Sequence, residues 1–137
     1  MISKICTFYI LSTGITNLIT FAPMKESYIN IKVKLDEEKV PHSIQWNATD
    51  STAQETQEAK AMLLAFWDGE GKSAMRIDLW NKDMTMDEMA DFFYQVLVTM
   101  GDTFNRATGK NELVNDLKKF ANEFHSKYET MEYGNKK

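Results

Sequence analysis

The stretch AMLLAFWDGEGKSAMRIDLW, from Ala61 to Trp80, decides how this sequence folds. Its middle is a turn cluster, Asp68 to Gly71, of the kind that separates two regular elements. After the turn, apolar residues alternate with other residues at a period of two, which is typical of a strand with one buried face. These apolar residues are Met75, Ile77 and Leu79. The stretch therefore predicts a β-hairpin.

The residues before the turn fit either a strand or a helix, because residues 59 to 67 also match the stripe of an amphipathic helix. A hairpin whose loop is Gly69 to Lys72 places an apolar residue opposite each apolar residue of the second strand, and this match favours the hairpin. The expected pairs are Phe66 with Met75, Leu64 with Ile77 and Met62 with Leu79. The opposite face then carries Leu63, Ala65, Trp67, Ala74, Arg76, Asp78 and Trp80.

An earlier hairpin is predicted over residues 28 to 48, where apolar residues alternate with polar ones on both sides of a polar turn at 36 to 39. Pro41 indicates that the second of its strands lies at an edge. The polar residues 49 to 58 then form a loop or a short helical turn. With the turn at 36 to 39, the expected cross-strand pairs are Ile31 with Ile44 and Ile29 with Trp46.

Two amphipathic helices follow the hairpins. Thr85 and Glu88 form a capping box at the start of the first helix, and Gly109 is placed to end it. The second helix starts near Asn111. Apolar residues recur at three-and-four spacing in both helices. They are Met86, Met89, Ala90, Phe93, Val96, Leu97, Met100 and Phe104 in the first, and Leu113, Leu117, Phe120, Ala121, Phe124 and Tyr128 in the second.

The predicted fold class is α+β, a four-stranded antiparallel sheet made of two hairpins followed by two helices packed on one face. We expect the helices to cover the face that carries Ile77, because that face is the more apolar one. Trp67 and Trp80 then lie on the uncovered outer face. If the helices covered the other face instead, both tryptophans would be core residues.

The composition is that of a globular protein, with 43% hydrophobic and 26% charged residues. The net charge of −4 argues against a nucleic-acid-binding surface, and Lys32, Lys34 and Arg76 are too few bases to form one. Cys6 is the single cysteine of the sequence, which excludes an internal disulfide and fits a reducing compartment.

We expect one α+β domain over residues 24 to 132 and a frayed tail over 133 to 137. Residues 1 to 23 form an N-terminal extension with one charge, Lys4. Three interpretations of this extension stand: a mis-assigned start upstream of Met24, a weak secretory signal, or an ordered segment. The extension is too polar to be an integral membrane segment. A cytoplasmic location is expected, or a periplasmic one if the extension acts as a signal.

The residues suggest no catalytic, cofactor or metal site. His42 and His125 are two histidines on distant elements, whereas a metal site needs three or four ligands held together. Asp83, Asp87 and Asp91 superficially resemble an acid/base group, but their place at a helix start accounts for them, because negative charge is favourable there.

The outer face of the second hairpin is the candidate partner-binding surface. A contiguous apolar patch is seldom exposed on a monomer, and Trp and Arg are frequent anchors of protein interfaces. Two tryptophans on one face therefore predict that another molecule docks there, with Arg76 and Asp78 orienting it. The candidate residues are Leu63, Ala65, Trp67, Arg76, Asp78 and Trp80.

Three phrases of the sequence are distinctive: AKAMLLAFWD (59 to 68), AMRIDLWNKDMTMDEMADFFYQVLVTMGDTFNRATG (74 to 109) and LVNDLKKFANEF (113 to 124). Their most specific segments are RIDLWNKDM and FFYQ. Together the phrases resemble the GldC family, the gliding-motility-associated GldC proteins of bacteria in the Bacteroidetes group. The resemblance covers about residues 27 to 128.

The resemblance implies a small soluble accessory protein of the gliding apparatus, associated with components that also serve a dedicated secretion system. It brings no catalytic motif, and family members begin near Met24. We therefore expect a non-enzymatic interaction module that docks a component of this apparatus, or a second copy of itself. The alternative is a small-ligand-binding or enzymatic domain that uses a cavity between sheet and helices, with contributions from His42, Trp46 and Tyr94.

Overall fold

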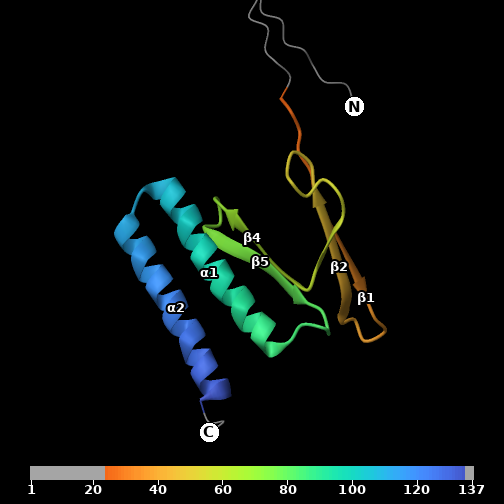
Figure 1. Ribbon diagram of the computed structural model, residues 1–137. Coiled ribbons are helices and arrows are strands. Elements are labelled where there is room, and N and C mark those ends of the chain that lie inside the picture. Colours follow the sequence, from red (N-terminus) through yellow and green to blue (C-terminus); the bar gives the residue numbers. More distant parts are fainter. Residues whose placement is uncertain (1–23, 135–137) are drawn as a thin grey trace, which may run out of the picture.

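A computed structural model describes residues 24 to 134. Strands come first and helices follow, which confirms the α+β fold class (Figure 1). The expected extension at 1 to 23 and the end of the expected tail, 135 to 137, lie outside the described residues. The elements are β1 (Ile29–Leu35), β2 (Pro41–Ala48), β3 (Gln57–Ala59), β4 (Ala61–Asp68), β5 (Ser73–Trp80), α1 (Met86–Thr108) and α2 (Asn111–Tyr133).

The expectation of a single four-stranded sheet is wrong. Strands β1, β2 and β3 form one antiparallel sheet, and β4 and β5 form a separate sheet of two strands. The division falls at Lys60, where the chain bends between β3 and β4. The Lys60 carbonyl accepts a hydrogen bond from the Asn81 N–H at 2.8 Å, and the Lys60 ammonium group pairs with Glu88 at 2.5 Å. These contacts join the bend at Lys60 to the segment between β5 and α1. The chain therefore turns away from β2 after Ala59, and only Gln57–Ala59 pair with β2.

The predicted register of the β4–β5 hairpin is confirmed. The Asp68 carboxylate accepts a hydrogen bond from the Glu70 N–H at 3.0 Å, a contact that stabilises the tight turn. Turn chemistry and strand alternation therefore agree on one pairing. The observed pairs include Phe66 with Met75, Leu64 with Ile77 and Met62 with Leu79.

The predicted register of the β1–β2 hairpin is wrong by two residues. The Asp36 carboxylate accepts hydrogen bonds from the N–H groups of Glu38 and Val40, each at 2.9 Å, and Lys39 takes a left-handed φ of 64°. This turn includes Val40, so the second strand starts one residue later than expected, and an irregularity between Lys34 and Leu35 shifts the pairing by one residue more. Because side chains alternate with a period of two, a shift of two residues leaves the same side chains on each face. The observed pairs include Ile31 with Trp46 and Val33 with Ile44.

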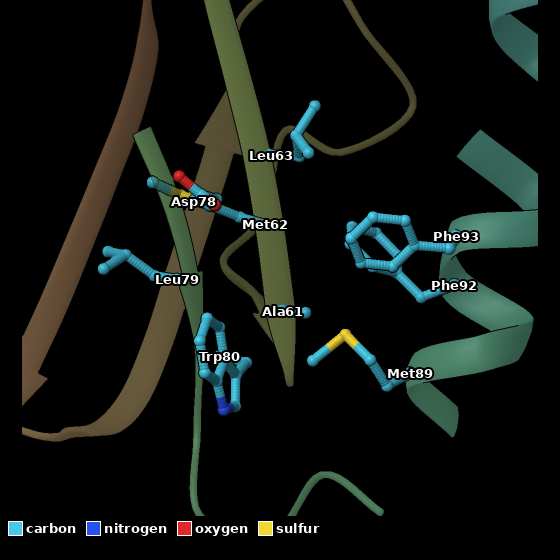
Figure 2. Close-up of a pocket in the computed structure, with 9 residues that line it drawn as sticks. All are labelled: Ala61, Met62, Leu63, Asp78, Leu79, Trp80, Met89, Phe92 and Phe93. Atoms are coloured by element: carbon cyan, nitrogen blue, oxygen red, sulfur yellow. The ribbon is translucent and has the colours of Figure 1, made fainter. Parts of the chain in front are cut away.

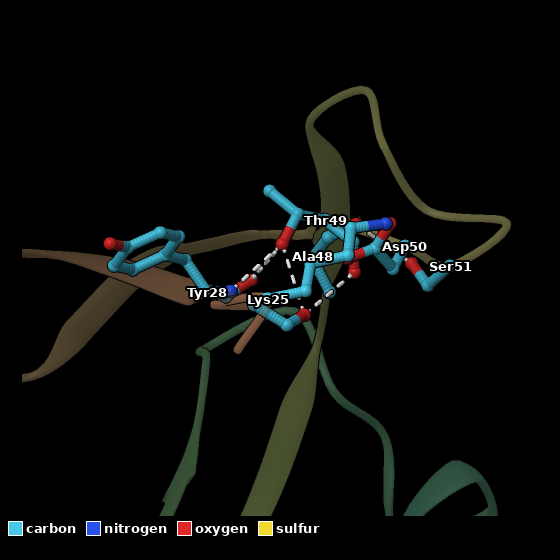
Figure 3. Close-up of polar contacts among 7 residues, drawn as sticks. Lys25, Tyr28, Ala48, Thr49, Asp50 and Ser51 are labelled. Carbon is cyan, nitrogen blue, oxygen red and sulfur yellow. Dashed lines mark hydrogen bonds and ion pairs between the residues drawn. The ribbon is translucent and has the colours of Figure 1, made fainter. Parts of the chain in front are cut away.

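Polar contacts close the open end of the β1–β2 hairpin (Figure 3). The Tyr28 N–H donates to the Thr49 hydroxyl at 2.8 Å, and the Thr49 N–H donates to the Tyr28 carbonyl at 3.0 Å. The Ser51 hydroxyl donates to the Ala48 carbonyl at 2.8 Å. These bonds anchor the start of the polar segment 49 to 56, which is a loop without a helical turn.

Both predicted caps of α1 are confirmed. The Glu88 N–H donates to the Thr85 hydroxyl at 3.2 Å, and the Thr85 N–H donates to the Glu88 carboxylate at 2.9 Å. Gly109 ends the helix with a φ of 67°, a left-handed conformation that glycine adopts without a steric cost. Helix α2 begins at Asn111, as expected, and runs to Tyr133.

The elements stack in layers, with α2 against α1, the β4–β5 hairpin beside α1, and the β1–β2 strands beyond the hairpin (Figure 1). In the close-up, Ala61 and Leu63 project toward α1, whereas Leu79 projects toward the β1–β2 side (Figure 2). Helix α1 therefore lies on the face of Leu63 and, by register, Trp80. Our expectation that the helices cover the Ile77 face is wrong, because the first sheet occupies that side.

Few apolar side chains are buried in the described part of the chain. The nearly inaccessible ones are Ile44, Ala53, Ala90, Val114 and Ala121. Large apolar side chains on the β4–β5 hairpin and on both helices stay exposed. The single chain therefore leaves much of its apolar surface available to other molecules.

Gly101 lies where α1 contacts α2. A methyl group at this position would lie 3.6 Å from Leu117 and from Val114, an ordinary van der Waals distance. Glycine inside a helix costs roughly 0.5–1 kcal/mol relative to alanine, so Gly101→Ala is expected to raise the free energy of unfolding by about that amount. Urea denaturation measures the change. Gly109→Ala is the control and should lower the free energy, because its φ of 67° disfavours a side chain. A decrease for Gly101→Ala would show that the helix contact does not accept a methyl group.

Candidate binding surface

The six candidate residues share one face of the β4–β5 hairpin. In an antiparallel pair, residues directly opposite each other project to the same face, and every second residue along a strand does so too. The candidate face is therefore continuous from the turn to the open end of the hairpin. Its cross-strand pairs are Ala61 with Trp80, Leu63 with Asp78, Ala65 with Arg76, and Trp67 with Ala74.

Both tryptophan rings on this face are open to solvent in the single chain. Trp67 is 69% exposed and Trp80 is 55% exposed, so the alternative in which they are core residues is wrong. The Arg76 Nε atom lies 3.5 Å from the Asp78 carboxylate, and both side chains are exposed. An ion pair this exposed contributes little to stability, so its charges are available to a partner.

Helix α1 turns one end of this face into an apolar groove. A cavity of about 280 Å³ opens between the hairpin and α1 (Figure 2). The phenyl rings of Phe92 and Phe93 contact each other edge to face, with their centres 6.1 Å apart. We call this cavity the hairpin groove. It is lined by Ala61, Met62, Leu63, Asp78, Leu79, Trp80, Met89, Phe92 and Phe93.

The helix side of the hairpin groove is a feature that sequence reasoning missed. Met89 and Phe93 belong to the expected buried stripe of α1, and Phe92 lies off that stripe. Neighbouring residues of a helix point about 100° apart, so two consecutive phenylalanines make the apolar sector of α1 wider than a single stripe. The FF doublet was therefore the one local signal that α1 has a second apolar direction.

A family model for gliding motility-associated proteins, described as GldC-like, matches residues 41 to 130. The chain belongs to the GldC-like family. This confirms the resemblance seen in the sequence and identifies a gliding motility-associated protein. The matched region runs from β2 into α2, and it includes the whole candidate face and the hairpin groove. No curated protein and no solved structure matches the chain.

The residues expected for the alternative site of this GldC-like protein do not converge. His42 and Trp46 lie on β2, in the first sheet. Tyr94 lies on α1 and faces α2, where its hydroxyl donates to the Asn122 side chain at 3.1 Å and its ring centre lies 5.0 Å from that of His125. The structure therefore does not bring the three together around one cavity.

A second polar cluster of the GldC-like protein joins the start of α1 to the end of α2. The Asp87 carboxylate accepts hydrogen bonds from the hydroxyls of Tyr128 at 2.9 Å and Tyr133 at 2.5 Å. The His125 Nε2 atom lies 2.7 Å from the Asp91 carboxylate. Burial and the hydrogen bond to Asp87 raise the pKa of Tyr128 to about 12, because a phenolate would be poorly solvated beside a carboxylate. Asp87 and Asp91 thus hold the helices together as well as lying near a helix start.

Two further results concern only residues 24 to 134. In that part of the GldC-like chain, no group of three or more His, Cys, Asp and Glu side chains could hold a metal ion. Neither of its two helices combines the length and the apolar character needed to cross a bilayer.

Proposed function

We propose that this GldC-like protein is a non-enzymatic accessory component of the gliding machinery that binds a protein partner through the candidate face and the hairpin groove. One observation carries the proposal. Trp67 and Trp80 are exposed at opposite ends of one hairpin face, and Trp80 lines an apolar cavity. The partner is a protein component of the gliding or secretion apparatus, which inserts an apolar segment between the hairpin and α1.

The exposed indole rings supply the affinity in this proposal. Burying their exposed parts would remove on the order of 300 Å² of mostly apolar surface from water. At about 25 cal/mol per Å², that corresponds to roughly 7 kcal/mol before the cost of association is subtracted. Arg76 and Asp78 carry opposite charges between the rings and would fix the orientation of the partner, as charges at an interface rim do.

The alternative of a small-ligand or enzymatic site has less support. Its expected residues do not meet, and the hairpin groove has one charged lining residue, Asp78. Pockets for small molecules usually combine an apolar lining with several convergent polar groups. An apolar groove of this size better accommodates one or two anchoring side chains of a protein.

We also place the protein in the cytoplasm in this proposal. The sequence has a lone cysteine and no possibility of an internal disulfide, which suits a reducing compartment. Fusing the protein to a reporter that is active on only one side of the inner membrane tests this placement. A signal from a reporter that is active only in the periplasm would contradict it.

The tryptophan pair provides the experiment. Affinity capture from native cells with the Trp67→Ala, Trp80→Ala double variant is expected to lose at least tenfold of the component that the wild type retains, because each truncation removes an interface anchor. The thermal midpoint should stay close to that of the wild type, since both rings are exposed. Tyr28→Ala is the matched control, because Tyr28 is an exposed aromatic residue in another layer.

Two results would contradict the proposal. One is equal capture by the wild type and the double variant. The other is a large fall in the thermal midpoint of the double variant, which would show that the rings support the fold itself.

A further inference from the structure

Helix α1 carries an apolar stripe that stays largely open to solvent within residues 24 to 134. Its four side chains are between 43% and 67% exposed, although they belong to the set expected to be buried. They are spaced by seven, seven and four residues, which places them on one side of a helix. The stripe is Met86, Phe93, Met100 and Phe104.

Helix α2 carries a matching stripe. Its four side chains are between 39% and 70% exposed and are spaced by seven, four and seven residues. The rings of Phe120 and Phe124 lie with their centres 6.4 Å apart. The stripe is Leu113, Phe120, Phe124 and Met131.

The two stripes point to the same side of the helix pair. On α1, the residue after a stripe residue faces α2: Tyr94 follows Phe93 and bonds to Asn122. On α2, the residue after a stripe residue is likewise turned inward, since Ala121 follows Phe120 and is fully buried. Adjacent residues of a helix differ by about 100°, so each stripe lies a quarter turn from the helix contact.

In both helices the stripe residue comes directly before the residue that faces the other helix, and the two helices run antiparallel (Figure 1). A twofold axis perpendicular to the plane that contains both helix axes exchanges α1 and α2. This rotation maps the side of the pair that carries the α1 stripe onto itself, so the α2 stripe lies on that side too. The eight side chains therefore form one continuous surface, which we call the two-helix face.

The two-helix face has the size that a stable dimer needs. Eight large apolar side chains, each about half exposed, offer roughly 800 Å² if a full side chain exposes about 200 Å². A standard specific interface buries about 800 Å² on each partner. Patches of this extent are rare on monomers.

The spacing of the stripes indicates what covers the face. Repeats of seven and four residues are those of helices that pack at small angles in four-helix bundles. A partner must then supply two antiparallel helices with apolar stripes at the same spacing, and a second copy of this chain has them. A twofold arrangement also brings each patch against its own equivalent, as closed dimers require.

We propose that two copies of this chain pair through their two-helix faces, forming a four-helix bundle in which each β4–β5 hairpin stays beside its own α1. Phe93 lies at the boundary between this face and the hairpin groove, and the exposed parts of Trp67 and Trp80 remain available to a different protein. The dimer goes beyond the proposed function and does not depend on it.

Sedimentation equilibrium of the full chain tests the proposal. The wild type is expected at twice the 15.8 kDa chain mass at micromolar concentration. The Met100→Glu, Phe120→Glu double variant should be monomeric, with a dissociation constant raised at least about 100-fold, because it places unpaired charges in an apolar interface. The matched control is Gln95→Glu, Asn115→Glu, which adds the same charges at exposed positions of the same helices and should stay dimeric.

Circular dichroism shows whether the double variant keeps its helices. If it does not, Phe120→Ala replaces it and should still raise the dissociation constant at least about tenfold. A monomeric wild type at the highest concentration reached would overturn the proposal. So would a dimer that survives Met100→Glu, Phe120→Glu but dissociates with Trp80→Glu, since that dimer would use the hairpin face. The Trp67→Ala, Trp80→Ala variant should remain dimeric, which separates this test from that of the proposed function.

Discussion

Replacing Ile44 by alanine is expected to lower the free energy of unfolding by about 3 kcal/mol. Ile44 is 1% exposed and is the one large side chain that is fully buried among the described residues. It lies at the centre of the first sheet, opposite Val33 on β1 and Ala59 on β3. Both neighbours belong to paired strands that cannot easily close over a cavity, so the lost contacts would not be recovered.

Urea denaturation at one protein concentration measures the Ile44→Ala effect, and the slope with urea should not change. Ile29→Ala is the control, because Ile29 lies on β1 and is exposed. That control should change the free energy by no more than about 0.5 kcal/mol. A loss below about 1 kcal/mol for Ile44→Ala would mean that the first sheet is not held together around this side chain.

Replacing Ala121 by leucine is expected to lower the free energy of unfolding by about 1–3 kcal/mol. Ala121 is 0% exposed and lies on the side of α2 that packs against α1. Alanine and leucine have similar helix propensities, so the effect would come from packing. A leucine would push the helices apart and strain the Asp102–Lys118 ion pair, whose atoms lie 2.6 Å apart.

Thermal and urea unfolding of Ala121→Leu can be compared with Ala107→Leu, which makes the same change at an exposed position of α1. The control should unfold almost as the wild type does. Equal stability of both variants would show that the helices have room between them, and would contradict the close contact seen at Gly101.

Much of the candidate face followed from local chemistry. Alternation in β5 and the DGEG turn were enough to predict the pairing of Phe66 with Met75, and that pairing puts Trp67 and Trp80 on one face. The same approach gave a wrong register for the first hairpin, because the left-handed Lys39 and the bonds to Asp36 lengthen its turn. A polar turn of ordinary composition carries no clear signal of its length.

The placement of layers could not be predicted in this way. Both faces of the β4–β5 hairpin are rich in apolar residues, so either could receive a helix. The contacts of Lys60 with Asn81 and Glu88 bend the chain, the first sheet takes the Leu79 side, and α1 is left with the other. The hairpin groove, which Phe92 helps to line, forms only because α1 lies on this side of the hairpin.

The sequence by itself determined the two hairpins, the two helices, the caps of α1, the β4–β5 register and the family, because each depends on residues that are close along the chain or on a distinctive phrase. Only the tertiary structure decided that the sheet divides at Lys60, that α1 and Trp80 border one groove, and that Phe93 and Phe120 stay exposed. The physical reason is that burial depends on which layers meet, and periodicity shows that a face is apolar without showing what covers it.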